Sequence, residues 1–478
     1  MSDYKMLIDG ELVEAESGKT FPVMNPATGE EFARIPVGDQ KEVNRAVAAA
    51  RKAFANWSQL PLERRAEALR KLAAAVRGRA EDLIKLDCLN HGTPINSSRV
   101  RGTILALERA ATQSQSLSAE ILDLGNRGFA YIHRQPIGVC ALITPWNVPL
   151  NQVVNKMAPA LIMGNTCVIK PPSIDSATTL VLGEIIAGLR DVIPPGVVNI
   201  ITGPGEVTGH ALASHPDVGM ISFTGSSEAG KSIMSAASRT VKRLTLELGG
   251  KNPFIVMEDA NIDSAAKVGV SAQTDITGQV CISPGRYYVH EKVHDEFVEK
   301  YIAAAKKVTV GDPFDQNTQM GPVVSEYHRN SIEAHIRSAI DEGAKLALGK
   351  LSPLPKPLDK GYYVLPTVLT GVTPKMKVYR EEIFGPVACI IKYFDKDDVI
   401  AMANDNTYGL SGSVWTRDIV KGIKTAHAIQ AGVVWVNQHM GMSGLPQGGV
   451  KESGIGKEGG SRGLDEYCEM NSIYINMD

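Results

Sequence analysis

The chain has 478 residues, a formal net charge of -2, and 44% hydrophobic and 21% charged residues. A chain of this length is too long to fold around a single hydrophobic core, so two or three domains are expected. The near-neutral charge favours neither nucleic acid nor a charged membrane surface as a partner. No apolar run reaches the roughly 18–20 residues that span a bilayer, and the acidic, polar start has no signal-peptide core; both features predict a cytoplasmic protein.

Six cysteines are scattered along the chain without a CxxC pair: Cys88, Cys140, Cys167, Cys281, Cys389 and Cys468. This pattern is typical of free thiols in an intracellular protein and differs from a disulfide framework or a zinc site. No metal is therefore expected. Most of these thiols should be small core residues, and a reactive one must be identified by its neighbours.

The first elements are short strands around Gly29 and Gly38, followed by helices from Gln40 to Leu86 and a further helix from Arg99 to Leu122. From Gly138 onwards strands and helices alternate. The expected strands are GVCALITPW, TCVIKPP, GVVNIITG and VGMISFTG, separated by the helices NQVVNKMAPALIMG, ATTLVLGEIIAGL and GEVTGHALASH. This alternation predicts a parallel, doubly wound sheet whose ligands lie at the carboxyl ends of the strands.

A second αβ block is predicted from Gly249 to about Gly448. Its expected strands are NPFIVM, RYYVHEK, CIIKYF, SGSVWT and GVVWVNQ, and the tail EYCEMNSIYINMD is expected to form a terminal strand. The stretch LSPLPKPLDKG and the glycine-rich residues from Gly441 to Gly460 are predicted to be loops.

One turn of the first block matches a nucleotide-binding loop. Gly225 to Ser232 reads GSSEAGKS, which fits G-x-x-x-x-G-K-[ST] between a strand and a helix and makes a nucleotide triphosphatase an alternative. Such an enzyme also needs an aspartate at the end of a second strand to hold magnesium, and no clear strand of that kind follows. The turn from Gly203 to Gly209 is one residue longer than the usual G-x-G-x-x-G fingerprint. Ordinary tight turns before a helix explain both segments equally well.

Cys281, Glu247 and Asn147 each lie beside glycines or prolines at predicted strand ends. A cysteine nucleophile needs a thiol that loses its proton and a donor for the oxyanion that it creates. Hydrolysis of the resulting thioester needs a base that activates water. The flanks GQV and ISPGR place Cys281 in a loop, which favours a chemical role over a core position.

Over nearly its whole length the chain resembles the aldehyde dehydrogenase superfamily. The motifs that carry the resemblance are, in order, TPWNVP, GNTCVIKPPS, FTGSSEAG, LELGGKNP, GQVC, EEIFGPV, NDNTYGLSGSVWT and PQGGVKESGIGKEGG. Their order and separations outweigh the isolated triphosphatase match. The resemblance implies that the protein oxidises an aldehyde to a carboxylic acid with NAD(P).

The resemblance also implies a role for each matching residue. Cys281 corresponds to the nucleophile, Asn147 with the backbone N–H of Cys281 to the oxyanion hole, and Glu247 to the general base. The implied cofactor-binding residues are Trp146, Lys170, Ser173, Gly205, Gly225, Ser226, Glu382 and Phe384. Lys156 corresponds to a lysine that is sometimes given a proton-relay role, and an ion pair at the surface explains it equally well.

Two departures from the family pattern concern specificity. Many NAD-preferring members have a glutamate three residues after the lysine; here that residue is Ser173, so NADP use is expected, alone or alongside NAD. A frequent aromatic residue before GGxKxSG is Gln447 in this chain. A polar substrate tunnel is expected, lined by Val148, Gln152, Ile282 and Gln447, with Asn155 beside it. Arg99 or Arg101 could meet an anionic substrate at its mouth, although solvated helix charges explain them better.

The resemblance implies an aldehyde dehydrogenase-like α/β fold, with two doubly wound parallel αβ domains and a small β oligomerisation element. The expected boundaries are 1–117, 137–248 and 449–468 for the Rossmann-like cofactor domain, 249–448 for the catalytic domain, and 118–136 with 469–478 for the oligomerisation element. The tail strand is expected to cross to a neighbouring subunit of a homodimer or homotetramer.

The alternatives at this point are the triphosphatase, a dehydrogenase that passes the acyl group to coenzyme A, and a non-enzymatic relative. Acylating relatives often lack the carboxylate at the position of Glu247, so hydrolysis is favoured. The intact set of Cys281, Glu247 and Asn147 argues against a non-enzymatic relative. The aldehyde itself is not indicated.

Overall fold

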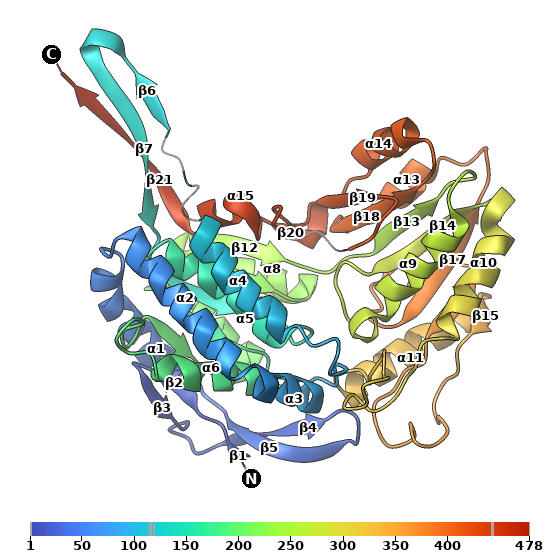
Figure 1. The fold of residues 1–478 in the computed structure, drawn as a ribbon, viewed down its shortest axis with the longest axis horizontal. Coiled ribbons are helices and arrows are strands. Elements are labelled where there is room, and N and C mark those ends of the chain that lie inside the picture. The colour runs from blue at the N-terminus through green and yellow to red at the C-terminus, as the bar shows by residue number, and fades with distance from the viewer. Residues whose placement is uncertain (1, 114–116, 118–119, 441–443, 478) are drawn as a thin grey trace.

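A computed structural model describes residues 2–113, 117, 120–440 and 444–477. Two large sheets, each flanked by helices, lie side by side, and a narrow arm of three strands projects from the first (Figure 1). None of the helices in these described ranges is long and apolar enough to cross a membrane.

The first sheet has the strand order β20-β12-β11-β8-β9-β10-β2-β3. Its parallel core consists of β8 (Val139–Ile143), β9 (Thr166–Lys170), β10 (Val198–Ile200), β11 (Met220–Thr224) and β12 (Arg243–Glu247), and its antiparallel edges are β2 (Met6–Ile8), β3 (Glu11–Val13) and β20 (Gly454–Ile455). Alternate residues of β8 enter different hydrophobic clusters: Cys140 and Leu142 on one face, Ala141 and Ile143 on the other. The sheet is therefore buried on both faces, as the parallel prediction requires.

Helices cover both faces of this sheet. They are α1 (Gln40–Trp57), α2 (Leu62–Gly78), α3 (Ala80–Asn90), α4 (Val100–Gln113), α5 (Pro149–Ile162), α6 (Ala177–Ala187), α7 (His210–Ser214) and α8 (Ser227–Ala237). Helix α1 begins at a capping box, in which the Asp39 side chain accepts from a backbone N–H and Glu42 accepts from the N–H of Asp39. Helix α5, which follows the Asn147 turn, begins with a proline that supplies a helical φ angle.

The second sheet has the order β15-β16-β17-β14-β13-β18-β19 and is parallel except for β15. Its strands are β13 (Asn252–Val256), β14 (Pro284–His290), β15 (Lys345–Leu348), β16 (Thr367–Thr370), β17 (Val387–Tyr393), β18 (Ser411–Trp415) and β19 (Val433–Val436). Its helices are α9 (Ile262–Thr274), α10 (Glu291–Ala305), α11 (Glu326–Asp341), α12 (Lys377–Arg380), α13 (Val399–Asn404) and α14 (Ile419–Ala428). The two doubly wound sheets confirm the predicted fold class.

The projecting arm consists of β6 (Ile121–Asp123), β7 (Gly128–Pro136) and β21 (Cys468–Asn476). Strand β21 pairs with β7 of its own chain from Cys468 opposite Pro136 to Asn476 opposite Gly128. The tail is thus an edge strand of its own arm, and its crossing to a neighbouring subunit stays a prediction. A separate small sheet near the N-terminus holds β1 (Ser2–Asp3), β4 (Thr20–Asn25) and β5 (Glu30–Pro36).

The predicted helix from Arg99 to Leu122 is wrong at its end; residues 114–116, 118 and 119 of that range lie outside the described residues. Helix α4 ends at Gln113, and Ile121 and Leu122 belong to the arm strand β6. Both side chains are exposed on the arm. The glycine-rich stretch predicted as a loop also holds β20 and is followed by the short helix α15 (Gly460–Asp465); residues 441–443 of that stretch lie outside the described ranges.

Candidate active site

The loop that carries Cys281 enters the second sheet at the amino end of β14. Ile276 and Thr277, just before it, adopt left-handed φ angles of 48° and 58°, which β-branched residues rarely do. The side chain of Asn252 anchors the loop, because its Nδ2 donates to the carbonyl oxygens of Cys281 at 2.8 Å and Ser283 at 2.7 Å. The backbone around the thiol is thus held in one conformation by side-chain hydrogen bonds.

Asn147 reaches this loop from the first sheet. It is buried in the turn after β8, and its Nδ2 donates to the carbonyl oxygen of Gln279 at 2.8 Å. A carboxamide nitrogen carries two hydrogens, so this bond uses one of them. The same side chain therefore fastens the cysteine loop and retains a second donor.

Glu247 ends β12, next to Thr224 of β11 in the sheet register. Its Oε1 is enclosed and has no hydrogen-bond partner. Burial, reinforced by the carboxylate of Glu458, raises the pKa of Glu247 to about 8, while Lys156 and Lys457 oppose the shift. A carboxylate with this pKa can accept a proton near neutral pH.

Lys156 is fully buried in α5 and forms an ion pair with Glu458, so the interpretation as a surface pair is wrong. This buried pair lies near Glu247, since both of its members influence the pKa of that carboxyl. The pKa of Glu247 therefore depends on this buried pair.

One cavity of about 230 Å³ brings together residues from both sheets. The first sheet contributes the turns after β8, β11 and β12, and the second contributes the cysteine loop and the turn before β17. The lining residues are Pro145, Trp146, Asn147, Thr224, Gly225, Ser226, Leu248, Gly249, Cys281, His328, Glu382 and Phe384. The cavity thus lies at carboxyl strand ends of the first sheet, as predicted.

The electrostatics of this cavity favour a protonated thiol. Burial, followed by the nearby carboxylates of Glu382 and Glu247, raises the pKa of Cys281 to about 12. Burial also raises the pKa of Glu382 to about 7, although its Oε1 accepts from the N–H of Gly250 at 3.0 Å. A Cβ atom at Gly249 would collide with the Glu382 carboxylate, so a larger residue there would displace that side chain. A positive charge placed in this cavity would favour the thiolate.

Aromatic rings form one wall of the cavity. Trp146 meets Phe384 edge to face with ring centroids 5.3 Å apart, and meets His328 at 5.0 Å. Opposite the wall, Ser226 caps α8 by accepting from the N–H of Ala229 at 3.2 Å. An apolar wall, a carboxylate and a helix N-terminus suit a flat cationic ring, its ribose and a phosphate, respectively.

Lys170, Ser173 and Gly205 form a separate group at the ends of β9 and β10. Ser173 Oγ donates to the carbonyl oxygen of Gly203 at 3.1 Å, and Lys170 Nζ donates to that of Pro171 at 3.1 Å. Burial lowers the pKa of Lys170 to about 8, an effect that the carboxylate of Glu206 opposes. Gly205 opens a π-helical turn, Gly205–Gly209, where a regular helix was expected.

The predicted substrate residues are dispersed around the cavity. Val148 and Ile282 flank Asn147 and Cys281 and are half-buried, whereas Gln447 is exposed and pairs through its backbone with Glu458. Gln152, one turn into α5, has an enclosed Oε1 without a hydrogen-bond partner. None of the four is among the residues that line the cavity.

Further along α5, the side chain of Asn155 donates to that of Asn151 at 3.0 Å. Arg99 pairs with Asp275 through Nη2 at 2.6 and 2.7 Å, so its charge is already neutralised. Arg101 is exposed.

The triphosphatase alternative is wrong. A phosphate-binding loop must wrap around its ligand before the helix begins, but α8 begins at Ser227 and already contains most of the matching residues. Lys231, which would reach the phosphates, is exposed and pairs with Glu452.

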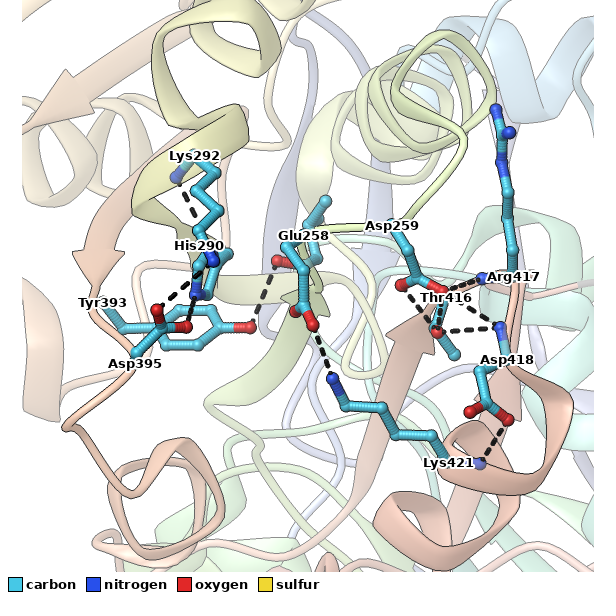
Figure 2. A network of polar contacts seen from close by, with 11 residues as sticks. Glu258, Asp259, His290, Lys292, Tyr393, Asp395, Thr416, Arg417, Asp418 and Lys421 are labelled. Carbon is cyan, nitrogen blue, oxygen red and sulfur yellow. Dashed lines mark hydrogen bonds and ion pairs between the residues drawn. The ribbon is translucent and has the colours of Figure 1, made fainter.

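The carboxyl ends of the second sheet hold a polar network (Figure 2). The carboxylate of Asp259 accepts from Thr416 Oγ1 at 2.7 Å and from two backbone N–H groups, Glu258 pairs with Lys421, and His290 pairs with Asp395. These groups satisfy one another. The amino ends of the second sheet, with the cysteine loop, therefore face the cavity. At its carboxyl ends the polar side chains form hydrogen bonds and ion pairs with one another.

Sequence reasoning missed several residues of the site. His328 lines the cavity from α11, and Asn252 and Gln279 hold the cysteine loop. Asn252 belongs to the motif LELGGKNP and Gln279 to GQVC, so both lie in segments already singled out. His328 lies in a polar helix without a motif, and no sequence signal indicated it.

Comparison with known proteins agrees with this architecture. The model of the aldehyde dehydrogenase family matches residues 12–473. An aldehyde dehydrogenase from Enchytraeus buchholzi is 41% identical, covering 98% of this chain and 95% of the relative. A betaine aldehyde dehydrogenase from Bacillus subtilis is 38% identical, covering 98% and 97%.

Solved structures show the same likeness. A putative aldehyde dehydrogenase from Burkholderia cenocepacia has a TM-score of 0.96 at 36% identity, covering 99% of this chain and 98% of that one. An aldehyde dehydrogenase from Bacillus cereus in complex with NAD+ has a TM-score of 0.96 at 34% identity, covering 100% and 97%.

The two sheets meet at a cavity that contains Cys281 and the N-terminus of α8, where a dinucleotide phosphate would fit. With the similarity to NAD+-bound structures, this arrangement is that of a nicotinamide-dependent oxidoreductase. Within that class, the chain belongs to the aldehyde dehydrogenase family. It is an NAD(P)-dependent enzyme that oxidises aldehydes.

Proposed function

We propose that Cys281 is the nucleophile, that Asn147 and the backbone N–H of Cys281 form the oxyanion hole, and that Glu247 is the general base. The observation that carries this proposal is the shared cavity, where Cys281 and Asn147 line one space and Glu247 raises the pKa of the thiol. The free N–H of Asn147 provides the donor that an oxyanion requires.

The protein's own residues account for the steps of the reaction. The Cys281 sulfur attacks the aldehyde carbon, and the donors of the oxyanion hole stabilise the resulting alkoxide. Oxidised nicotinamide, when bound, would supply a positive charge that favours the thiolate and would be the acceptor of the hydride. Glu247 in its ionised form then removes a proton from water, and the hydroxide releases the acid from the Cys281 thioester.

We propose the residues around the cavity as the cofactor site. Trp146 and Phe384 would pack on the nicotinamide ring, Glu382 would accept from its ribose, and Gly225 and Ser226 would receive the pyrophosphate at the start of α8. Lys170, Ser173 and Gly205 would surround the adenosine ribose. Because Ser173 places no charge there, NADP is proposed as a cofactor beside NAD.

The substrate is proposed to be an aldehyde with a polar tail. This proposal rests on the polar residues predicted around the tunnel, Gln152, Asn155 and Gln447, which suit a substrate with a hydroxyl or amine group. The pairing of Arg99 with Asp275 argues against an anionic substrate at that position.

One assay tests this proposal. Formation of reduced cofactor would be followed with NAD and NADP in parallel on aliphatic, aromatic, amino and acidic aldehydes, without coenzyme A. Turnover with release of free acid supports hydrolysis by Glu247. A requirement for coenzyme A would instead make the enzyme an acylating dehydrogenase and remove the role assigned to Glu247.

A homodimer or homotetramer assembled through the arm is proposed as well. Ile121, Leu122 and Tyr474 are 69%, 59% and 71% exposed there, and apolar side chains at this density favour contact with another subunit. Light scattering of the native protein and of an Ile121→Asp, Leu122→Asp variant tests this: the variant should dissociate. An unchanged mass would rule out the arm as the interface. The free state of all six cysteines supports a reducing, cytoplasmic compartment.

A further inference from the structure

The segment from Gly321 to His328 runs beside the cysteine loop and is bonded to it. Thr277 Oγ1 donates to the carbonyl oxygen of Gly321 at 3.1 Å, and the N–H of Val324 donates to Gln279 Oε1 at 3.0 Å. His328, one turn into α11, then contacts the aromatic wall of the cavity. The segment therefore connects the cysteine loop to the aromatic wall formed by Trp146 and Phe384.

The turn that presents Phe384 to the cavity adopts a backbone conformation that its residue disfavours. Phe384 has a φ angle of 57°, in the left-handed region, which a bulky side chain enters only when its surroundings enforce it. Two side chains hold the turn: His328 Nε2 lies 2.8 Å from the carbonyl oxygen of Phe384, and Gln273 Nε2 donates to that of Gly385 at 2.8 Å.

The chemistry of these atoms fixes the proton of His328. A carbonyl oxygen can only accept, so Nε2 of His328 carries the hydrogen. Burial lowers the pKa of His328 to about 4, which keeps the ring neutral at working pH. The bond is therefore a permanent one between neutral groups.

We propose that His328 is a positioning residue for hydride transfer. Its bond to the Phe384 carbonyl keeps the Phe384 ring against Trp146, and this wall in turn fixes how the nicotinamide ring lies over Cys281. The inference rests on the proposed function of the cavity. His328 acts through Phe384 and takes no part in proton transfer.

Two variants distinguish the effect of the hydrogen bond from His328 to the Phe384 carbonyl from the effect of packing by the His328 ring. His328→Leu removes the donor, and His328→Gln supplies an amide nitrogen at a similar distance from the backbone. The matched control is Tyr327→Ala, because Tyr327 is the neighbouring residue of α11 and is 86% exposed. His328→Asn, with a shorter amide that does not reach the carbonyl, provides a second variant should His328→Leu fail to fold.

Each variant would be assayed for NAD binding, for the rate of reduced-cofactor formation in a single turnover at saturating NAD, and for hydrolysis of 4-nitrophenyl acetate without cofactor. Ester hydrolysis needs the nucleophile and water but no hydride acceptor. His328→Leu and His328→Asn should slow hydride transfer by about tenfold to a hundredfold, the cost of a misplaced reacting group, and leave ester hydrolysis within roughly twofold. His328→Gln should recover most of the hydride-transfer rate, and Tyr327→Ala should match the native enzyme.

Other outcomes would overturn the inference. Equal losses of hydride transfer and ester hydrolysis would mean that His328 merely supports the cysteine loop. Weaker NAD binding with an unchanged single-turnover rate would make His328 a contact for the cofactor. Failure of the proposed function itself looks different, since Cys281→Ala would then retain both aldehyde oxidation and ester hydrolysis.

Discussion

Cys281 is the proposed nucleophile, and its thiol is the first group to test. Cys281→Ala should abolish aldehyde oxidation and leave NAD binding intact, because the cavity keeps its aromatic wall and Glu382. Reduced-cofactor absorbance measures the first effect, and quenching of tryptophan fluorescence by NAD measures the second. Cys468→Ala, a buried thiol at the base of the arm, serves as the control and should stay active. Substantial turnover by Cys281→Ala would refute the nucleophile assignment.

The raised pKa of Glu247 predicts a particular pH dependence. Only the ionised carboxylate accepts a proton, so thioester hydrolysis should accelerate with rising pH and level off above about 8. Glu247→Gln should keep the first burst of reduced cofactor and lose steady turnover by about a hundredfold or more, and its residual rate should not follow this profile. Rapid-mixing kinetics at several pH values measure both. A variant that retains the pH profile would assign it to another group.

The same ionisation affects stability with the opposite sign. Because the folded pKa of Glu247 is raised from the usual 4.5, the folded protein binds the extra proton between about pH 4.5 and 8. This contribution to stability is present below that window and is lost as the pH rises through it.

Ser173 governs the choice of cofactor in the proposed site. Ser173→Glu would place a carboxylate beside the 2′-phosphate of NADP, so kcat/KM should fall far more for NADP than for NAD, by about tenfold or more for a repulsion of 1–2 kcal/mol. Steady-state kinetics with both cofactors provide the measurement. Equal losses for the two cofactors would mean that Ser173 lies away from the adenosine ribose.

At the scale of elements, the cysteine loop depends on Gly278. This glycine has a φ angle of 72°, and a Cβ atom there would collide with the backbone of Gly385. Gly278→Ala should lower the free energy of unfolding by about 2–4 kcal/mol and reduce activity sharply, since the loop of the nucleophile must move. Urea unfolding and steady-state kinetics test this.

A matched control exists for that substitution. Gly18 has a similar φ angle of 65°, with open space around its Cβ position. Gly18→Ala therefore measures the backbone cost alone, of about 1 kcal/mol, and should leave activity intact. If both variants lose the same stability, the contact with Gly385 is not limiting.

The sequence predicted the elements whose signal is local. Alternating strands and helices between Val139 and Glu247 follow directly from apolar runs closed by glycine and proline turns. The end of α4 was missed because no glycine or proline separates it from Ile121 and Leu122, which lie on an exposed arm. The pairing of β21 with β7 joins segments over 300 residues apart, and strand partners at that distance leave no local trace. The domain boundaries remain predictions.

The site followed a similar division. Cys281, Asn147 and Glu247 were predicted because each belongs to a motif, and the structure brings the first two into one cavity with Glu382 and Phe384. His328 was missed because its part depends on a contact with the Phe384 carbonyl, which only the packing of α11 creates. The pKa of Cys281 was likewise out of reach, since it depends on burial and on two carboxylates from distant segments.

At the scale of the whole molecule, the proposed catalytic residues come from two sheets. Asn147 belongs to the first, the cysteine loop to the second, and one hydrogen bond from Asn147 to Gln279 joins them at the cavity. Heating should separate these groups before either sheet melts. Activity assayed at temperature should therefore decline several degrees below the midpoint measured by circular dichroism. Coincident curves would show that the two halves unfold as one unit.

The arm has a practical consequence for handling the protein. Strand β21 runs outward along β7, so the C-terminus is marked at the tip of the arm, far from the N-terminus beside β1 (Figure 1). An affinity tag fused after β21 would sit among the exposed apolar side chains through which subunits are proposed to meet. A tag on the N-terminus would avoid that surface, and it is the better choice for purification and for immobilising the enzyme on a support.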